Sequence, residues 1–339
     1  GQWIVEKDWP STEIKHAKFY LTSNGILGGD ASELNNIIKS PATCGFGASS
    51  YFPMSSSVPE QSGDQRADDT YSLCFDGNPS KTTIDIVGRP KIKLTLKSDN
   101  QCGHLCVRLC DVSPEGSSTR ITYGLLNLAH RESHENPTPI PVDKEFSIEL
   151  ELDQIAYRLL PENKLRISLS NAYWPLVWPV AEQATLTLVK GELLLPIRQK
   201  SDKPEYVFSD PEVASPWSRK IIKKPSYSNK IITDQMTNAV TIEIFDDYGI
   251  VEDNNHGLQI GTVVREAFSI HPNDPLCASG HIHWTQTLAR NKWNIRTEAY
   301  TSLTSDKNNF YMTAKIEAFE EEKLIFEKEF KETIKRSFH

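Results

Sequence analysis

Alternation of apolar and polar residues with a period of two is the feature of this sequence that most restricts its fold. Ile92, Leu94 and Leu96 alternate with lysines and a threonine. The same pattern returns in three further runs, at 146–152, 165–169 and 186–188. Side chains of a strand point alternately to the two faces of a sheet, so each run predicts a strand with one buried face. Several short strands separated by turn sequences favour an all-β sandwich, and we expect no helix between Thr82 and Lys190.

A second β region is predicted toward the end of the chain. Val240, Ile242 and Ile244 alternate with polar residues, and further strands are expected from Trp293 onward and across 310–318. Residues 320–334 are ambiguous, because their Glu and Lys residues favour a helix while the apolar residues fall on one face of a strand. We predict a hairpin strand there.

Length and composition divide the chain of 339 residues into four parts. The expected parts are a loop-rich lead-in that packs on a sandwich (1–80), the β-sandwich itself (81–197), a linker rich in Lys, Ser, Asp and Pro (198–232), and an antiparallel β domain (233–339). A stretch of loop as long as the lead-in is unusual inside a compact domain unless it is functional or packs across another body.

Charge and composition exclude several classes of function. The formal net charge is -8 and the pI is near 5.7, which argues against binding to nucleic acid or anionic lipid. The basic run 219–224 is expected to be a solvated connector. No apolar run is long enough to span a membrane and no export signal is visible, so we expect a cytoplasmic protein with its six cysteines reduced.

Motifs for catalysis or metal binding are weak in this sequence. There is no Gly-x-Ser-x-Gly elbow, no His-Glu-x-x-His and no phosphate-binding loop. Cys102, His104, Cys106 and Cys110 share one face of an extended strand, but about 26 Å would separate the outer two, too far for one tetrahedral zinc ion. No catalytic residue, metal or cofactor is therefore assigned.

Two tryptophans in the stretch 174–179 allow two interpretations. Exposed rings on a β-sandwich can stack on sugars or bind a partner, whereas buried rings complete a core or a domain contact. We favour packing for Trp174 and Trp178. The alternative is a free-standing protein that binds a carbohydrate or a partner through these rings.

A set of short motifs, in order along the chain, resembles a known family. The motifs are Asp64-Gln65-Arg66 with Asp68-Asp69, 73–76, 86–90, 107–116, 123–124, 165–170 and the Trp-Pro pair at Trp178. Together they resemble the C-terminal jelly roll of the X-Pro dipeptidyl-peptidase and cocaine esterase-like (CocE/NonD) serine hydrolases. The resemblance implies that the sandwich at 81–197 is a jelly-roll β-sandwich of the galactose-binding-like type. Residues from about Asp246 to the end are similar to an extra β domain of some longer members.

The resemblance implies that this chain is the C-terminal accessory region of a larger peptidase or esterase. In that family an α/β-hydrolase domain, which precedes the jelly roll, carries the Ser, Asp and His of the catalytic triad, and nothing here matches those motifs. The isolated chain is therefore expected to be inactive, with that N-terminal domain as its partner. Gly45 and Phe46 resemble a stretch that approaches the substrate pocket, although Phe46 separates glycines that are usually adjacent. Homo-oligomerisation stays open.

Overall fold

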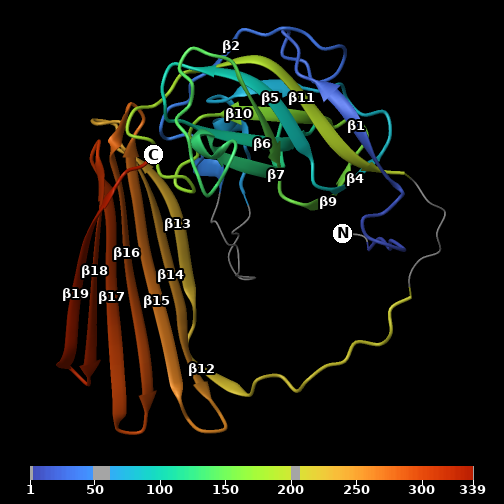
Figure 1. Ribbon diagram of the computed structural model, residues 1–339. Helices are drawn as coiled ribbons and strands as arrows, with labels where there is room; N and C mark the ends of the chain where they lie inside the picture. The colour runs from blue at the N-terminus through green and yellow to red at the C-terminus, as the bar shows by residue number, and fades with distance from the viewer. Residues whose placement is uncertain (1–2, 49–61, 200–206, 339) are drawn as a thin grey trace. The chain divides into compact units, whose positions relative to one another are not determined.

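The computed structural model describes residues 3–48, 62–199 and 207–338. The chain divides into two compact units (Figure 1). The first contains the described residues up to Pro211 together with Phe338, and the second runs from Glu212 to Ser337. No helix among the described residues is long and apolar enough to cross a membrane.

The first unit is a β-sandwich of two antiparallel sheets. The larger sheet has the order β8-β5-β11-β4-β9, with β1 and β2 also paired to β11. Its strands are β1 (Ile14–Tyr20), β2 (Asn36–Ile38), β4 (Ile84–Gly88), β5 (Lys91–Ser98), β8 (Phe146–Glu151), β9 (Ile155–Leu159) and β11 (Leu186–Arg198). The smaller sheet has the order β3-β10-β6-β7, formed by β3 (Leu73–Asp76), β6 (His104–Val112), β7 (Ser118–Asn127) and β10 (Lys164–Ser170). This is the predicted all-β, jelly-roll-like fold.

The core of the sandwich lies where the apolar faces of its two sheets meet. Ile92, Leu94 and Leu96 of β5 are buried there with Leu165, Ile167 and Leu169 of β10. These are the residues that the alternation assigned to the inner faces, so the two-residue period did predict the core. Apart from the short 3₁₀ turn η2 (Leu128–His130), the described residues between Thr82 and Lys190 contain no helix, as predicted.

Strand β6 is buried on both of its faces. Leu105, Val107 and Leu109 belong to the core between the sheets. The other face carries His104, Cys106, Arg108 and Cys110, which are also buried. A polar face of a strand that is buried to this degree needs a second layer that can satisfy its charge, and that layer is described with the candidate site below.

The lead-in also contributes strands to both sheets. β1 and β2 pair with β11 in the larger sheet, and β3 pairs with β10 in the smaller one. Between β2 and β3 lie the 3₁₀ turn η1 (Phe46–Ala48) and the four-residue helix α1 (Arg66–Asp69). Much of the first 80 residues is therefore part of the sandwich itself.

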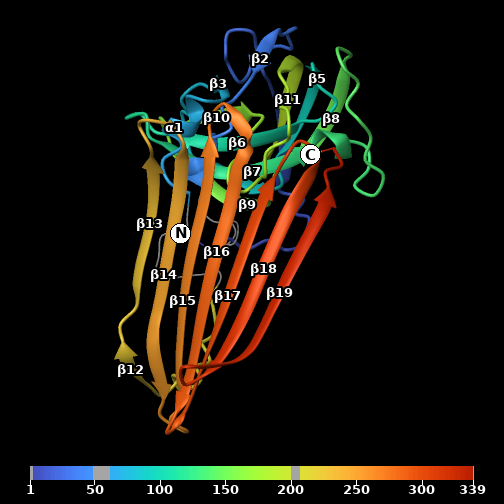
Figure 2. The ribbon, with the colours of Figure 1, turned by 90° about the vertical axis from the view of Figure 1, so that its left-hand side faces the viewer.

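The second unit contains an eight-stranded antiparallel sheet in which most neighbours follow the chain order (Figure 2). The strands are β12 (Arg219–Lys223), β13 (Ser226–Thr233), β14 (Val240–Asp253), β15 (Gln259–His271), β16 (Asp274–Arg290), β17 (Trp293–Ser305), β18 (Asn309–Glu320) and β19 (Lys323–Lys335). Asn291 has a φ of +56° in the tight turn between β16 and β17, a conformation that asparagine tolerates well.

Two sequence-based expectations need correction, and one ambiguity is resolved. The segment 198–232 was expected to be a linker, but it includes β12 and most of β13, which both pair with β14. The basic run 219–224 is therefore mostly strand and not only a connector. β19 shows that the last segment is a strand paired to β18, as predicted, because its hairpin partner outweighs its moderate helix propensity.

Candidate functional site

The loop that contains Gly45 and Phe46 approaches the backbone that follows β10. Gly45 has a φ of +119°, which residues with a side chain rarely adopt. A Cβ atom at this position would lie 2.5 Å from the carbonyl oxygen of Trp174. The backbone N–H of Trp174 also donates a 2.7 Å hydrogen bond to the carbonyl oxygen of Cys44. Glycine is therefore required at position 45 both by its conformation and by this close approach.

Two side chains of the 64–69 motif hold the loop through its backbone. The carboxylate of Asp68 accepts hydrogen bonds of 2.8 Å from the N–H groups of Gly45 and Gly47, one on each oxygen. Gln65 donates from Nε2 to the carbonyl oxygen of Gly47 at 2.8 Å. Asp68 and Gln65 are both buried. Hydrogen bonds to an ionised acceptor are among the strongest in proteins, so this arrangement fixes the backbone of the 45–47 loop.

Arg108 links the motif to the buried outer face of β6. Its guanidinium donates to Oε1 of Gln65 at 2.9 Å and to Oγ of Ser72 at 2.9 Å. It also forms an ion pair of 3.0 Å with Asp69, and neither side chain is more than 4% exposed. A buried charge is tolerated only when it is paired and hydrogen-bonded. Arg108 therefore supplies the charge that allows the acidic 64–69 segment to cover β6.

Asp69 is the centre of the remaining polar contacts. Its carboxylate accepts hydrogen bonds of 2.8 Å from the hydroxyl groups of Ser118 and Ser168. It also forms an ion pair of 3.0 Å with Nη1 of Arg166. The same guanidinium group forms a second ion pair with Asp76. The hydrogen bond to Asp76, together with that to Asp69, raises the pKa of Arg166 above its usual value. Strands β6, β7 and β10 are thus all joined to α1 through one carboxylate, and Arg166 links this cluster to Asp76 of β3.

Only one of the two predicted substrate-binding residues has side-chain surface to offer. Gly45 is buried, whereas Phe46 is half-buried. Gly45 therefore sets the path of the loop, while the Phe46 ring is available for contact with another molecule. The assignment of both residues to a substrate pocket stays a prediction.

The tryptophans singled out in the sequence do not form an open stacking platform. Trp174 is 1% exposed and packs edge-to-face against Trp178, with ring centroids 5.4 Å apart. Nearby Tyr173 is also buried, and its hydroxyl accepts a 2.6 Å hydrogen bond from Arg120. A ring with almost no exposed face cannot stack on a sugar.

The cysteine and histidine motifs do not assemble into a metal centre. Among the described residues, no group of three or more His, Cys, Asp or Glu side chains is placed to hold a metal ion. Burial raises the pKa of the Cys110 thiol to about 12, which disfavours the thiolate that zinc requires. His130 and His134 lie near each other, with ring centroids 5.6 Å apart.

A Thr-His-Glu cluster in the second unit superficially resembles a catalytic triad. Nε2 of His283 lies 2.7 Å from Glu298 and 3.4 Å from Oγ1 of Thr285. Thr285 itself donates to Glu298 at 2.6 Å. A triad needs the base to contact the nucleophile and the carboxylate through opposite ring nitrogens. Here both contacts involve the same nitrogen, so the cluster is not arranged for nucleophilic catalysis.

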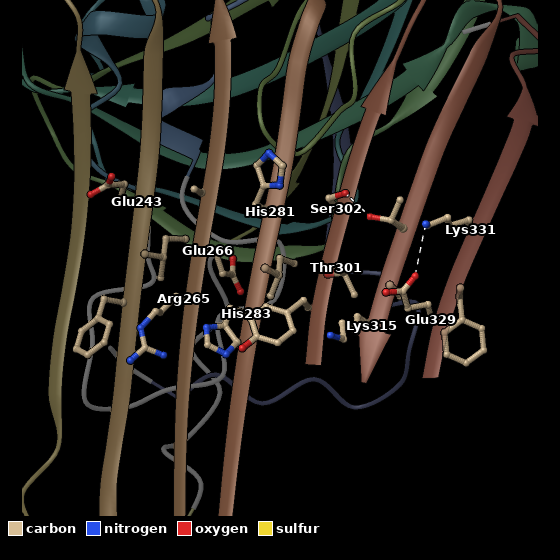
Figure 3. Close-up of a pocket in the computed structure, with 18 residues that line it drawn as sticks. Glu243, Arg265, Glu266, His281, His283, Thr301, Ser302, Lys315, Glu329 and Lys331 are labelled. Carbon is tan, nitrogen blue, oxygen red and sulfur yellow. Dashed lines mark hydrogen bonds and ion pairs between the residues drawn. The ribbon is translucent and has the colours of Figure 1, made fainter. Parts of the chain in front are cut away.

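A transverse groove of about 660 Å³ crosses six strands of the second unit, β14 to β19 (Figure 3). Its walls are two cross-strand rows on one face of the sheet, defined by the pairing register: Glu243, Ala267, His281, Ser302, Thr313 and Lys331, and Phe245, Arg265, His283, Tyr300, Lys315 and Glu329. His283 stacks on Tyr300 with centroids 4.2 Å apart, and Arg265 lies over Phe245. Lys315 and Lys331 are paired with carboxylates. The groove therefore combines aromatic side chains with charged ones that are mostly paired.

Gln65, Asp68 and Arg108 were not predicted to have separate roles, although the sequence analysis singled out the motifs that contain them. The signal that could have identified their role is Arg108, because an arginine in the middle of an otherwise buried strand requires a partner. Its partners Gln65 and Asp69 are 43 and 39 positions away in the chain, so their identity depends on the fold.

Comparison with known proteins defines the class to which this architecture belongs. The family described as "X-Pro dipeptidyl-peptidase C-terminal non-catalytic domain" matches residues 1–227. The chain therefore belongs to this family, and the motif that holds the 45–47 loop lies inside the matched region.

Three relatives illustrate the match. Cocaine esterase from Rhodococcus sp. (strain MB1 Bresler) is 21% identical over 189 residues, which are 51% of this chain and 33% of that protein. The structure of an aminopeptidase from the marine sediment archaeon Thaumarchaeota archaeon is 19% identical with a TM-score of 0.52, and covers 58% of this chain and 39% of its own. A CocE/NonD family hydrolase from Staphylococcus aureus is 13% identical with a TM-score of 0.45, with coverage of 58% and 39%. The chain spans about a third of the length of the curated relative it matches.

Proposed function

We propose that this chain is the accessory part of a serine hydrolase and that a separate α/β-hydrolase domain of the same polypeptide carries the catalytic triad. The parent enzyme would cleave an ester, or an amide that follows proline, through an acyl-enzyme. The observation that supports this role most directly is the loop at Gly45–Gly47, whose backbone is held by Asp68 and Gln65 while the Phe46 side chain stays half-buried.

In this proposal the jelly roll shapes the entrance to the active site. A loop that must line a substrate pocket benefits from a fixed backbone, because a preorganised site loses less conformational entropy when substrate binds. The buried Arg108 and Asp69 provide that support from beneath the motif. Phe46 would then supply an apolar surface for the substrate.

The isolated chain is expected to lack hydrolase activity. A fluorophosphonate probe, which labels activated serines, should leave the chain of 339 residues unmodified in intact-mass spectrometry. Stoichiometric labelling of one serine would contradict the proposal. An antibody raised against the chain should also detect, in freshly lysed source cells, a polypeptide clearly larger than 38.3 kDa.

The competing idea, a free-standing carbohydrate-binding protein, loses one of its two proposed rings because Trp174 is buried. The carbohydrate-binding hypothesis can still be tested by fluorescence. Quenching of tryptophan fluorescence by oligosaccharides that is lost in Trp178→Ala would favour it, and a native polypeptide of 38.3 kDa would move it ahead of the hydrolase proposal.

A further inference from the structure

The face of the second sheet opposite the transverse groove carries large apolar side chains that remain exposed. Trp284, Met312, Ile316 and Phe330 are between 37% and 47% exposed. The pairing register places them in three cross-strand rows on β16 to β19: Gly280, Leu303, Met312 and Glu332; Ile282, Thr301, Ala314 and Phe330; and Trp284, Ala299, Ile316 and Lys328. These twelve residues are called the apolar face below.

The side of β16–β19 that contains the apolar face is large enough for a protein interface. Four strands about 4.8 Å apart and about twelve residues long present roughly 750 Å² on this side of the sheet, and the three rows of the apolar face occupy about half of it. A standard stable interface buries about 800 Å² on each partner. Soluble monomers rarely leave continuous apolar areas of more than a few hundred Å² open to water. The apolar face has four large side chains that are more than a third exposed, so we expect it to have a partner.

The partner is expected on the face of the sheet and not along its free edge. The edge strand β19 places Glu327, Glu329 and Lys331 on the groove side and Lys328 on the apolar side. Charged side chains on an edge strand, especially lysines pointing inward, oppose the addition of another strand. Addition of another strand at the β19 edge is therefore disfavoured.

The apolar face is complementary to itself. A two-fold axis parallel to the strands, passing between β17 and β18, brings β16 over β19 of a second copy and β17 over β18. Trp284 then faces Lys328 of the second copy, an arrangement that suits a cation–π contact. In the same row, small Ala299 faces larger Ile316 of the second copy, which allows close packing between the sheets.

The other two rows fit the same symmetry. Ile282 faces Phe330 of the second copy, and Leu303 faces Met312. Within the three rows only Lys328 and Glu332 are charged, and the carboxylates of Asp246 and Glu266 lie outside them on β14 and β15. A two-fold arrangement therefore buries apolar residues against apolar residues without placing like charges opposite each other.

We propose that the apolar face of β16–β19 is a homodimer interface, in which the second-unit sheets of two copies pack face to face around a two-fold axis parallel to their strands. This interface does not involve the 45–47 loop, so it does not depend on the function proposed above.

Analytical ultracentrifugation of the 339-residue chain, from nanomolar to high micromolar concentrations, tests the proposal. We expect a reversible change from 38.3 kDa to twice that mass. Phe330→Glu should remove the dimer at all these concentrations. Lys331→Glu is the matched control, because it lies next in β19 on the opposite face and changes the net charge by more. A monomeric wild-type chain, or equal dissociation by Lys331→Glu, would overturn the proposal.

Two variants with opposite charges test which residues face each other across the interface. Recovery of the dimer when they are mixed distinguishes a lost interface from a misfolded chain. Ile282→Glu and Phe330→Lys should each give monomers, because each homodimer would bury two unpaired charges. An equimolar mixture should associate as a heterodimer, with one Glu-Lys pair and one native Ile-Phe contact. Far-ultraviolet circular dichroism of each variant checks that it is folded. Folded variants that stay monomeric when mixed would contradict the two-fold arrangement.

Discussion

In the sandwich, the apolar faces of two sheets cover each other. In the second unit, the apolar face of β16–β19 belongs to a single sheet whose opposite face carries the transverse groove. The core of the sandwich contains side chains of 0–2% exposure, such as Ile92 and Ile167. On β16 to β19, side chains of similar size remain more than a third exposed. The same alternation of residues therefore has two outcomes. A strand pattern predicts that one face will be buried, but it does not tell which body buries it.

The largest expected difference between the units concerns buried charge. Asp69→Ala should lower the free energy of unfolding of the sandwich by about 3–5 kcal/mol, because Arg108 would remain buried without its carboxylate. Glu298→Ala in the second unit should cost about 1 kcal/mol or less, since its partners His283 and Arg296 are about 30% exposed.

Hydrogen exchange resolved by peptide measures this effect within each unit. Peptides from β6 and β10 should lose protection in Asp69→Ala, and peptides from β17 should change little in Glu298→Ala. Equal losses in the two variants would show that the charge clusters of the two units are equally important to stability.

A smaller difference is expected for two isoleucines that lie on the apolar faces of their strands. Ile167→Ala should cost about 2–5 kcal/mol, because it leaves a cavity in a core where Ile167 is fully buried. Ile316→Ala should cost less than about 1 kcal/mol in the monomer, because this side chain is 37% exposed. Urea unfolding at low and high protein concentration separates the two. If the second unit dimerises, only the cost of Ile316→Ala should grow with concentration.

The smallest expected effect is a difference in response to acid. Burial alone would raise the pKa of Asp76, but hydrogen bonds from Arg166 and Lys164 outweigh it and hold the pKa below its usual value. The folded state therefore favours the carboxylate, and the stability it contributes is present above the unfolded pKa of about 3.9 and lost as the pH falls through the folded pKa.

Glu266 of the second unit has the opposite sign. Burial, together with repulsion from Asp246, raises its pKa. Its charge therefore destabilises the fold once the pH exceeds the folded pKa, and acid relieves this cost. Thermal unfolding between pH 3 and 7 should show a shallower acid limb in Asp76→Asn and higher stability at neutral pH in Glu266→Gln. Unchanged profiles in both variants would contradict these assignments.

The period-two pattern predicted strands well but not their complete set. It identified β5, β8, β10 and β14 because each has an unbroken apolar face. It missed β12 and β13, where Lys, Ser and Pro225 suggested a linker, because pairing with β14 outweighs composition. β16 was also missed, because His281 and His283 interrupt its apolar pattern. The pairing register places both histidines on the groove side of the sheet.

The candidate site was less accessible to sequence reasoning than the fold. Resemblance to a family pointed to the loop at Gly45, but the support beneath it depends on contacts between Arg108 and residues about 40 positions away. Such contacts have no local pattern. An isolated arginine in a buried strand signals that a partner exists, and only the folded chain shows which one.

The way in which the 45–47 loop is held has a consequence for sequence variation. Within the loop, Asp68 and Gln65 form hydrogen bonds only with backbone atoms of Gly45 and Gly47. The residue between the two glycines is therefore outside this set of hydrogen bonds. Exchange of Phe46 for a smaller, larger or polar residue would leave the loop scaffold intact, so mutation could change the surface presented at this position without a need for compensating changes in the sandwich.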